Sequence, residues 1–96
     1  DLSYTDLSHS NLIGADLSHS KIYKSNLINA NLSYTNLKNV DLIYSDLEGT
    51  NLEYANLSGA NLTGSNLKKS SLIGTNLNKV ILCKTIMPWG KDNSGC

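Results

Sequence analysis

The chain has 96 residues, with eight basic and eight acidic side chains that give a net charge of zero. Neutral charge argues against nonspecific nucleic-acid binding. No stretch approaches the roughly 18 consecutive apolar residues of a membrane-spanning helix, so none is expected. A chain of this length lies near the size at which an ordinary globular core becomes marginal.

A five-residue repeat runs from Leu2 to Leu82. Every fifth residue is leucine, except Ile22, which gives seventeen pentads. The residue two positions before each later leucine is Ala, Ser, Thr or Val, and the residue directly before the leucine is Asp or Asn in fourteen pentads. The repeat is clearest from Asn51 to Leu67, where the sequence reads NLEYANLSGANLTGSNL.

This period fits neither a helix nor a flat strand. On a helix, at about 100° per residue, successive leucines would be rotated by roughly 140° around the axis. On a flat strand an odd period would send alternate leucines to opposite faces. The chain must therefore turn in every pentad, which predicts a solenoid filled by leucine and small residues, with coils stacked about 4.8 Å apart by backbone hydrogen bonds.

The pattern of a small residue, Asp or Asn, Leu and two variable residues, from Asp1 to about Thr85, resembles the pentapeptide-repeat proteins. The resemblance implies an all-β fold: a right-handed quadrilateral parallel β-helix with four pentads per coil and about four coils. We therefore expect a repeat domain over residues 1–85 and a C-terminal capping tail over residues 86–96.

Four pentads per coil would stack residues that are twenty apart on four faces. Faces 1 to 4 are named here by the first-coil leucines Leu2, Leu7, Leu12 and Leu17, and the second residue after each leucine is called the corner residue. Gly and Asn corners suit turns with a positive φ, whereas Tyr, His and Lys corners suggest another turn class. We therefore expect mixed corner geometry.

Charge alternates in bands along this stack. Residues 1–20 carry three acids, 21–40 three lysines, 41–60 four acids and 61–80 three lysines, with no opposite charge within any band. This predicts ion pairs between neighbouring coils, such as Lys21 with Asp1 and Asp41, or Glu48 with Lys68. The bands serve either to fix coil register and solubility or to bind a charged partner.

Exposed aromatic residues identify the candidate partner surface. Large apolar and aromatic side chains on a surface often mark protein interfaces. Face 1 offers Tyr4, Tyr23, Ile43 and Tyr44, and face 3 offers Tyr34 and Tyr54 as a second choice.

After Leu82 the repeat gives way to CKTIMPWGKDNSGC. We expect Ile86, Met87 and Trp89 to form a lid over the last coil, with Pro88 preventing a further ladder and Gly90 permitting a turn. The ending resembles the Met-Pro-x-Gly segment that closes many bacterial, especially cyanobacterial, family members. Trp89 stands where those members often have Asp.

The two cysteines, Cys83 and Cys96, allow two interpretations. With twelve residues between them, the tail can fold back and close a disulfide, which would favour the periplasm or the thylakoid lumen. Alternatively, both are free thiols in a reducing cytoplasm.

The sequence indicates no catalytic, cofactor-binding or metal site. His9 and His19 are two pentads apart and so fall on opposite faces, and an interior filled by leucine leaves no cleft for a substrate. We expect a non-catalytic structural or protein-interaction module with an unknown protein partner. The resemblance implies one alternative, a DNA-mimicking inhibitor of DNA gyrase or topoisomerase, known for a few members that are long, acidic and dimeric, unlike this short and neutral chain.

The N-terminal coil presents an open edge above apolar side chains, which is a template for pairing. We therefore expect either a homodimer through this coil or a preceding segment that caps it. Its acidic residues would repel each other in a two-fold contact, so salt should strengthen such a dimer. The residues concerned are Leu2, Leu7, Leu12 and Leu17, with Asp1, Asp6 and Asp16.

Overall fold

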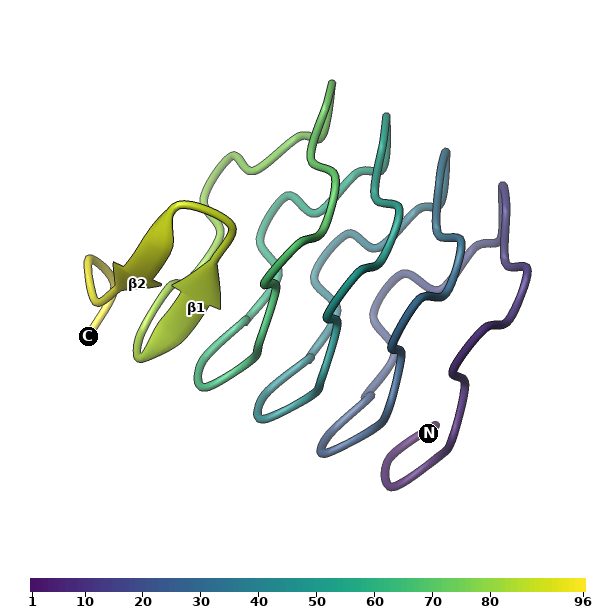
Figure 1. The fold of residues 1–96 in the computed structure, drawn as a ribbon, viewed down its shortest axis with the longest axis horizontal. Coiled ribbons are helices and arrows are strands. Elements are labelled where there is room, and N and C mark those ends of the chain that lie inside the picture. The colour runs from purple at the N-terminus through teal and green to yellow at the C-terminus, as the bar shows by residue number, and fades with distance from the viewer.

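In the computed structural model, which describes all 96 residues, the chain winds into stacked square coils that progress from the N-terminus to the C-terminus (Figure 1). Parallel bridges join residues that are twenty positions apart, from Asp6 with Asn26 to Asn66 with Ile86. The fold is the predicted right-handed quadrilateral β-helix with four pentads per coil. It measures 30 × 27 × 23 Å.

Backbone hydrogen bonds between coils follow one rule in the middle of the stack. The N–H groups of Leu42 and Tyr44 donate to the carbonyls of Asn61 and Thr63, each at 2.9 Å, and Asn61 N–H donates back to the carbonyl of Val40 at 2.9 Å. Each pentad thus contributes one bridge and then turns. Regular strands occur only at the C-terminal end, where β1 (Thr85–Met87) pairs antiparallel with β2 (Gly90–Asp92).

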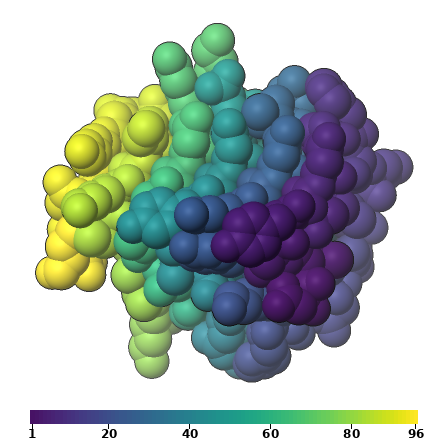
Figure 2. All heavy atoms as spheres, turned by 90° about the horizontal axis from the view of Figure 1, so that it is seen from below, coloured from purple at the N-terminus to yellow at the C-terminus, as the bar shows by residue number.

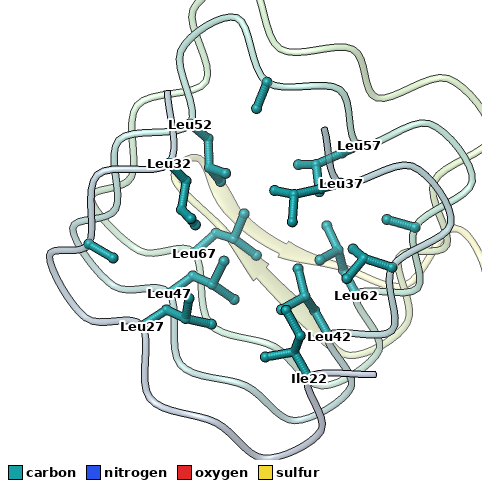
Figure 3. Close-up of a cluster of buried hydrophobic side chains, with 14 of the residues drawn as sticks. Ile22, Leu27, Leu32, Leu37, Leu42, Leu47, Leu52, Leu57, Leu62 and Leu67 are labelled. Carbon is teal, nitrogen blue, oxygen red and sulfur yellow. The ribbon is translucent and has the colours of Figure 1, made fainter. Parts of the chain in front are cut away.

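The leucines and Ile22 form four columns inside the coils (Figure 3). From Ile22 to Leu67 every one of them is buried, and the small residues beside them are buried as well. The hydroxyls of these small residues bond to leucine carbonyls, as Thr35 Oγ1 does to Leu32 O at 2.6 Å. No buried side-chain polar atom lacks a hydrogen-bond partner. The interior is therefore a leucine core whose few polar groups are all satisfied.

The core is less well covered at both ends. Leu2, Leu7, Leu12 and Leu17 in the first coil pack against the core but are only partly buried, and so are Leu72 and Leu77 in the fourth. Each coil is covered by its two neighbours, so the end coils lose about half of this contact.

All seventeen corner residues adopt a positive φ, whatever their side chain. Values are 60° for Tyr34, 62° for His19, 63° for Lys69 and 71° for Gly59. The expectation of another turn class at Tyr, His and Lys corners was wrong. In most pentads the leucine carbonyl accepts from the N–H three residues later, and a turn of this form with a positive φ at its third residue is type II. The requirement to close each coil overrides the preference of the corner residue.

Variation between corners appears instead in the hydrogen bonds of face 1. The N–H groups of Thr5 and Ser25 donate to the hydroxyls of Ser25 and Ser45 in the next coil, at 3.2 and 3.1 Å. Ser25 Oγ in turn donates to Leu2 O at 2.6 Å. At Thr5 and Ser25 a hydrogen bond between coils thus replaces the internal turn hydrogen bond, which Ser45 and Ser65 on the same face retain.

The β-helical ladder continues to Met87. Leu67 N–H donates to Ile86 O at 2.6 Å, and Met87, twenty residues after Leu67, is 1% exposed at the position of a further leucine. Thr85 is the buried small residue of this pentad. The tail then reverses through β2, and Gly95 N–H donates to Leu82 O at 2.7 Å. Figure 1 shows this hairpin at the yellow end of the stack.

Of the three residues expected to form the lid, only Met87 is inside. Ile86 is 42% exposed and Trp89 is 67% exposed. Side chains alternate along a strand, so in β1 Thr85 and Met87 point inward and Ile86 points outward. Trp89 lies in the turn between β1 and β2. The end of the core is therefore filled by one more repeat residue, and the backbone of the tail covers part of the edge.

Candidate functional site

Three tyrosines on face 1 form one continuous aromatic surface. Tyr4 and Tyr44 are corner residues of the first and third coils, and Tyr23 precedes the corner of the coil between them. The ring centroids of Tyr4 and Tyr23 are 5.7 Å apart and those of Tyr23 and Tyr44 are 6.2 Å apart, both pairs edge to face. The register of the coils therefore brings together rings from residues that are distant in sequence.

This tyrosine surface is open to solvent and carries positive charge. Tyr4 is 72% exposed and Tyr44 is 53% exposed. The ammonium groups of Lys21 and Lys24 lie 6.0 and 5.4 Å from the centroid of the Tyr23 ring, within the range of cation–π attraction. The surface is thus aromatic with two cations at its centre, and Ile43 lies half-buried beside Tyr44.

Face 3 presents a smaller aromatic pair. The rings of Tyr34 and Tyr54 stack with their centroids 5.2 Å apart and their planes inclined by 20°. Gly74, in the next coil, is closely approached by the Tyr54 ring, which occupies the space a Cβ would need. Two rings offer less contact area than the three on face 1.

The expectation of ion pairs between neighbouring coils was wrong: Lys21 pairs with neither Asp1 nor Asp41, and Glu48 does not pair with Lys68, because other groups engage Lys21 and Glu48. Lys21 is the bridge partner of Asp41, while its ammonium group lies over the Tyr23 ring. Glu48 Oε1 accepts from Asn66 Nδ2 at 3.4 Å. The carboxylates of the third coil are therefore linked to the fourth coil by hydrogen bonds, from Asn66 to Glu48 and from Ser71 to Glu53, whereas the cation–π contacts of Lys21 and Lys24 stay within the second coil.

Two acidic side chains of the first coil have an altered pKa. The Ser8 hydroxyl donates to Asp6 Oδ1 at 2.6 Å, and the Ser8 N–H donates to the same oxygen. Ser18 does the same for Asp16. These hydrogen bonds stabilise the carboxylate form and lower the pKa of both aspartates.

Neither histidine contributes to a metal site in this fold. His9 and His19 are corner residues of faces 2 and 4, as the spacing predicted. No group of three His, Cys, Asp or Glu side chains is placed to hold a metal ion.

Cys83 and Cys96 are joined by a disulfide, with their Cα atoms 4.7 Å apart. The structure thus agrees with the first interpretation of the cysteines, in which the tail folds back and closes a disulfide. The bridge fixes the end of the tail beside Lys84, whose N–H donates to Asn93 Oδ1 at 2.7 Å. The structure contains no helix with the length and apolar character needed to cross a membrane.

Sequence reasoning missed a groove on face 4. It has a volume of about 350 Å³ and no apolar lining residue; the lining residues are Lys38, Asn39, Ser58, Gly59, Asn78 and Lys79. The signal for it was present, because Ser58 and Gly59 are small where the coils on either side carry longer side chains.

A family model of pentapeptide repeats matches the chain with eight copies, over residues 1–39, 23–53 and 50–87. The matched residues extend to Met87, one residue past Ile86, which is the last residue bridged to the preceding coil. No curated protein matches the chain.

Several solved structures of pentapeptide-repeat proteins are similar to the chain. Rfr23 from the cyanobacterium Cyanothece 51142 is 41% identical with a TM-score of 0.62, covering 83% of this chain and 58% of Rfr23. HetL from Nostoc sp. strain PCC 7120 is 33% identical with a TM-score of 0.51, covering 90% of this chain and 42% of HetL. The alr5209 protein from Nostoc PCC 7120 is 28% identical with a TM-score of 0.78, covering 96% and 74%. The chain thus spans about half the length of the first two.

Proposed function

Because the chain belongs to the pentapeptide-repeat family, whose members are generally structural repeat proteins, we propose that it is a non-catalytic protein-interaction module. One observation carries this proposal: the continuous, exposed surface of Tyr4, Tyr23 and Tyr44 on face 1. HetL is involved in heterocyst differentiation regulation, a role that suits a module acting through other proteins.

The tyrosine surface has the properties of an interface anchor. Tyrosine is enriched among residues that dominate binding energy, and its ring gives a large contact area for little lost rotational freedom. The backbone beneath Tyr23 and Tyr44 is hydrogen-bonded to both neighbouring coils and that beneath Tyr4 to the second coil, so the rings are presented on an ordered support. Lys21 and Lys24 favour a partner that combines apolar side chains with carboxylates.

The proposal is tested with two double variants. Tyr4→Ala/Tyr44→Ala removes the outer rings of face 1, and Tyr34→Ala/Tyr54→Ala removes the pair on face 3. Proteins captured from a lysate of the host organism are quantified by mass spectrometry for wild type and both variants. We expect the face 1 variant to lose the proteins enriched by wild type by about tenfold or more, and the face 3 variant to retain them.

Equal unfolding midpoints in urea must first establish that both variants fold. If only the face 3 variant loses partners, the interface is on Tyr34 and Tyr54. If both variants capture the same proteins as wild type, the aromatic surfaces are not the interface.

The disulfide supports an oxidising compartment for this protein, such as the periplasm or the thylakoid lumen. Alkylation of cysteines in intact cells, followed by mass spectrometry, tests this directly. We expect Cys83 and Cys96 to be bridged and protected from alkylation. Two alkylated thiols would place the protein in a reducing compartment.

A homodimer through the N-terminal coil is a separate proposal, supported by the partial exposure of Leu2, Leu7, Leu12 and Leu17. The acidic side chains of this coil repel one another across a two-fold contact, so screening by salt should favour the dimer. Light scattering at low and high salt measures this. A monomer under both conditions would overturn the proposal.

The alternative, a DNA-mimicking inhibitor of gyrase, requires an extended acidic surface. In this fold the acidic coils alternate with basic coils every twenty residues, so no face is acidic along its length. A supercoiling assay with the purified protein distinguishes the alternatives. An interaction module of the kind proposed leaves the supercoiling activity of gyrase unchanged, whereas a DNA mimic inhibits it.

A further inference from the structure

The groove on face 4 crosses the second, third and fourth coils. Ser58 and Gly59 form its half-buried floor, while Lys38 and Asn39 on one side and Asn78 and Lys79 on the other form exposed walls. It exists because the third coil carries two small residues between two coils with long side chains. Its volume of about 350 Å³ falls at the lower end of the range for small-molecule sites.

The lining of the groove combines hydrogen-bond donors, which are the Lys38 and Lys79 ammonium groups and the Ser58 hydroxyl, with the Asn39 and Asn78 amides, which both donate and accept. The Ser58 hydroxyl has no partner within the chain, whereas the equivalent hydroxyl of Ser18 donates to Asp16 Oδ1 at 2.7 Å. Asn39 Oδ1 occupies the space that a Cβ at Gly59 would need, so this amide places its acceptor over the floor of the groove.

Charge selects the kind of ligand. Lys38 and Lys79 give the groove two positive charges, and the face 4 pentads of coils 2 to 4 contain no acidic residue. A phosphate monoester carries a charge of about −1.5 to −2 at pH 7 and three strong acceptor oxygens. A carboxylate brings half this charge and two oxygens. We infer that this groove binds the phosphate group of a small phosphorylated ligand.

Face 2 provides an internal comparison. Its corner column of Asn29, Gly49 and Lys69 matches Asn39, Gly59 and Lys79 on face 4 residue for residue. The preceding positions all differ, because face 2 has Ile28, Glu48 and Lys68 where face 4 has Lys38, Ser58 and Asn78. Glu48 adds a negative charge and accepts from Asn66 Nδ2 at 3.4 Å. The corner residues alone therefore do not create the groove, and the residues before them, with the small Ser58 at the centre, contribute to it.

The inference is tested by nuclear magnetic resonance of ¹⁵N-labelled protein during titration with inorganic phosphate at constant ionic strength, with acetate as the comparison anion. We expect saturable shifts at the amides of Ser58, Gly59 and Asn78 with phosphate and none with acetate. Ser58→Glu copies the face 2 residue into the groove and should weaken phosphate binding by about tenfold or more. Lys79→Ala should weaken it similarly, and Lys69→Ala, its matched control on face 2, should not.

Two further arms identify the source of the phosphate. Glycerol 3-phosphate tests a soluble ligand, and vesicles of phosphatidylcholine with phosphatidic acid test a lipid headgroup. Binding of either that is lost in Ser58→Glu supports the inference. Equal shifts with acetate, equal shifts at Gly49 and Gly59, or unchanged binding in a folded Ser58→Glu variant would overturn it.

Discussion

At the scale of single residues, the repeat assigns one task to each position. Leucine fills the core and the small residue packs beside it, as the sequence predicted. The residue before leucine acts on the turn, because its side-chain oxygen accepts from the N–H two residues later, as Asn51 Oδ1 does from Glu53 at 3.0 Å. The same bond recurs at Asn56 and Asn61, at 3.0 and 3.1 Å. This local bond explains why Asp and Asn, and not any polar residue, occupy the position.

Corner residues were the poorest prediction at this scale. Residue preference assigns positive φ to Gly and Asn, yet Tyr4, His9 and Lys24 adopt it too. The left-handed conformation costs other residues roughly 1–2 kcal/mol each. In each pentad, the hydrogen bonds between coils and the burial of a leucine outweigh this cost. These contacts depend on the folded stack, so the identity of the corner residue alone does not predict its backbone conformation.

Two glycines on face 3 separate the backbone cost of a corner from the cost of close packing. Gly14 and Gly74 have φ values of 71° and 68°, but a Cβ at Gly14 meets nothing within 4 Å, whereas one at Gly74 meets the Tyr54 ring. We expect Gly14→Ala to lower the free energy of unfolding by roughly 1–2 kcal/mol. Gly74→Ala should cost about 0.5–1.5 kcal/mol more, because Tyr54 must leave its stack with Tyr34. Urea denaturation measures both, and equal losses would show that the ring moves at no cost.

The lowered pKa values of Asp6 and Asp16 predict a loss of stability in acid. Because the folded-state pKa lies below the unfolded value of about 4, the contribution is complete above that pH. It disappears as pH falls through the folded-state pKa. The double variant Asp6→Asn/Asp16→Asn should keep the hydrogen bonds within the turns, since Asn11 and Asn26 make the same bonds elsewhere. Its urea unfolding midpoint should decrease less than that of wild type when the pH is lowered from neutral to acid. If the variant loses as much stability in acid as wild type does, groups other than Asp6 and Asp16 cause that loss.

At the scale of elements, the C-terminal hairpin shows where pattern reading stops. Pro88 and Gly90 correctly signalled a change of direction, but Thr85, Ile86 and Met87 were not recognised as a further pentad. Met replaces the leucine and Ile replaces the Asp or Asn, so the pentad matches the repeat only at its small residue. The stacking of Ile86 on Asn66 restores the register.

Substitutions in this hairpin test which residue closes the core. Met87→Ala removes a side chain that is 1% exposed and should lower the free energy of unfolding by about 2–5 kcal/mol. Trp89→Ala removes a larger but exposed ring and should change it by less than about 1 kcal/mol. Thermal or urea denaturation of the two variants decides. A greater loss for Trp89→Ala would restore the tryptophan as the lid.

At the scale of the whole molecule, the period of five and the count of four pentads per coil determine which distant residues meet. This register places Tyr4, Tyr23 and Tyr44 on one face, so the aromatic surface could be predicted before the structure. The groove on face 4 was missed although its residues are visible in the sequence, because finding it requires the side-chain sizes of three successive coils to be compared in the correct register. In the view of Figure 2, the side chains of successive coils form ridges across the surface of the stack. Surface relief of this kind follows from packing, which the repeat pattern does not encode.

Stability in a stack of coils should depend on position along the axis, because each coil is covered only by its neighbours. Leu47 and Leu7 occupy the same column on face 2, but Leu47 is fully buried in the third coil and Leu7 is partly exposed in the first. Leu47→Ala should cost about 3–5 kcal/mol and speed amide exchange throughout the stack. Leu7→Ala should cost about 1–2 kcal/mol, since less of the side chain is removed from water.

Hydrogen exchange distinguishes this model from one in which the chain unfolds as a single unit. In Leu7→Ala, faster exchange should be confined to N–H groups of the first coil, such as those of Leu12 and Leu17, which donate to Asn31 and Asn36 in the second. The amide of Leu62, bonded to Ile81 at 2.9 Å, should keep its wild-type protection. A stack that frays from its end loses its first coil before the others. Uniform loss of protection in both variants would therefore contradict this expectation and show that the coils do not open independently.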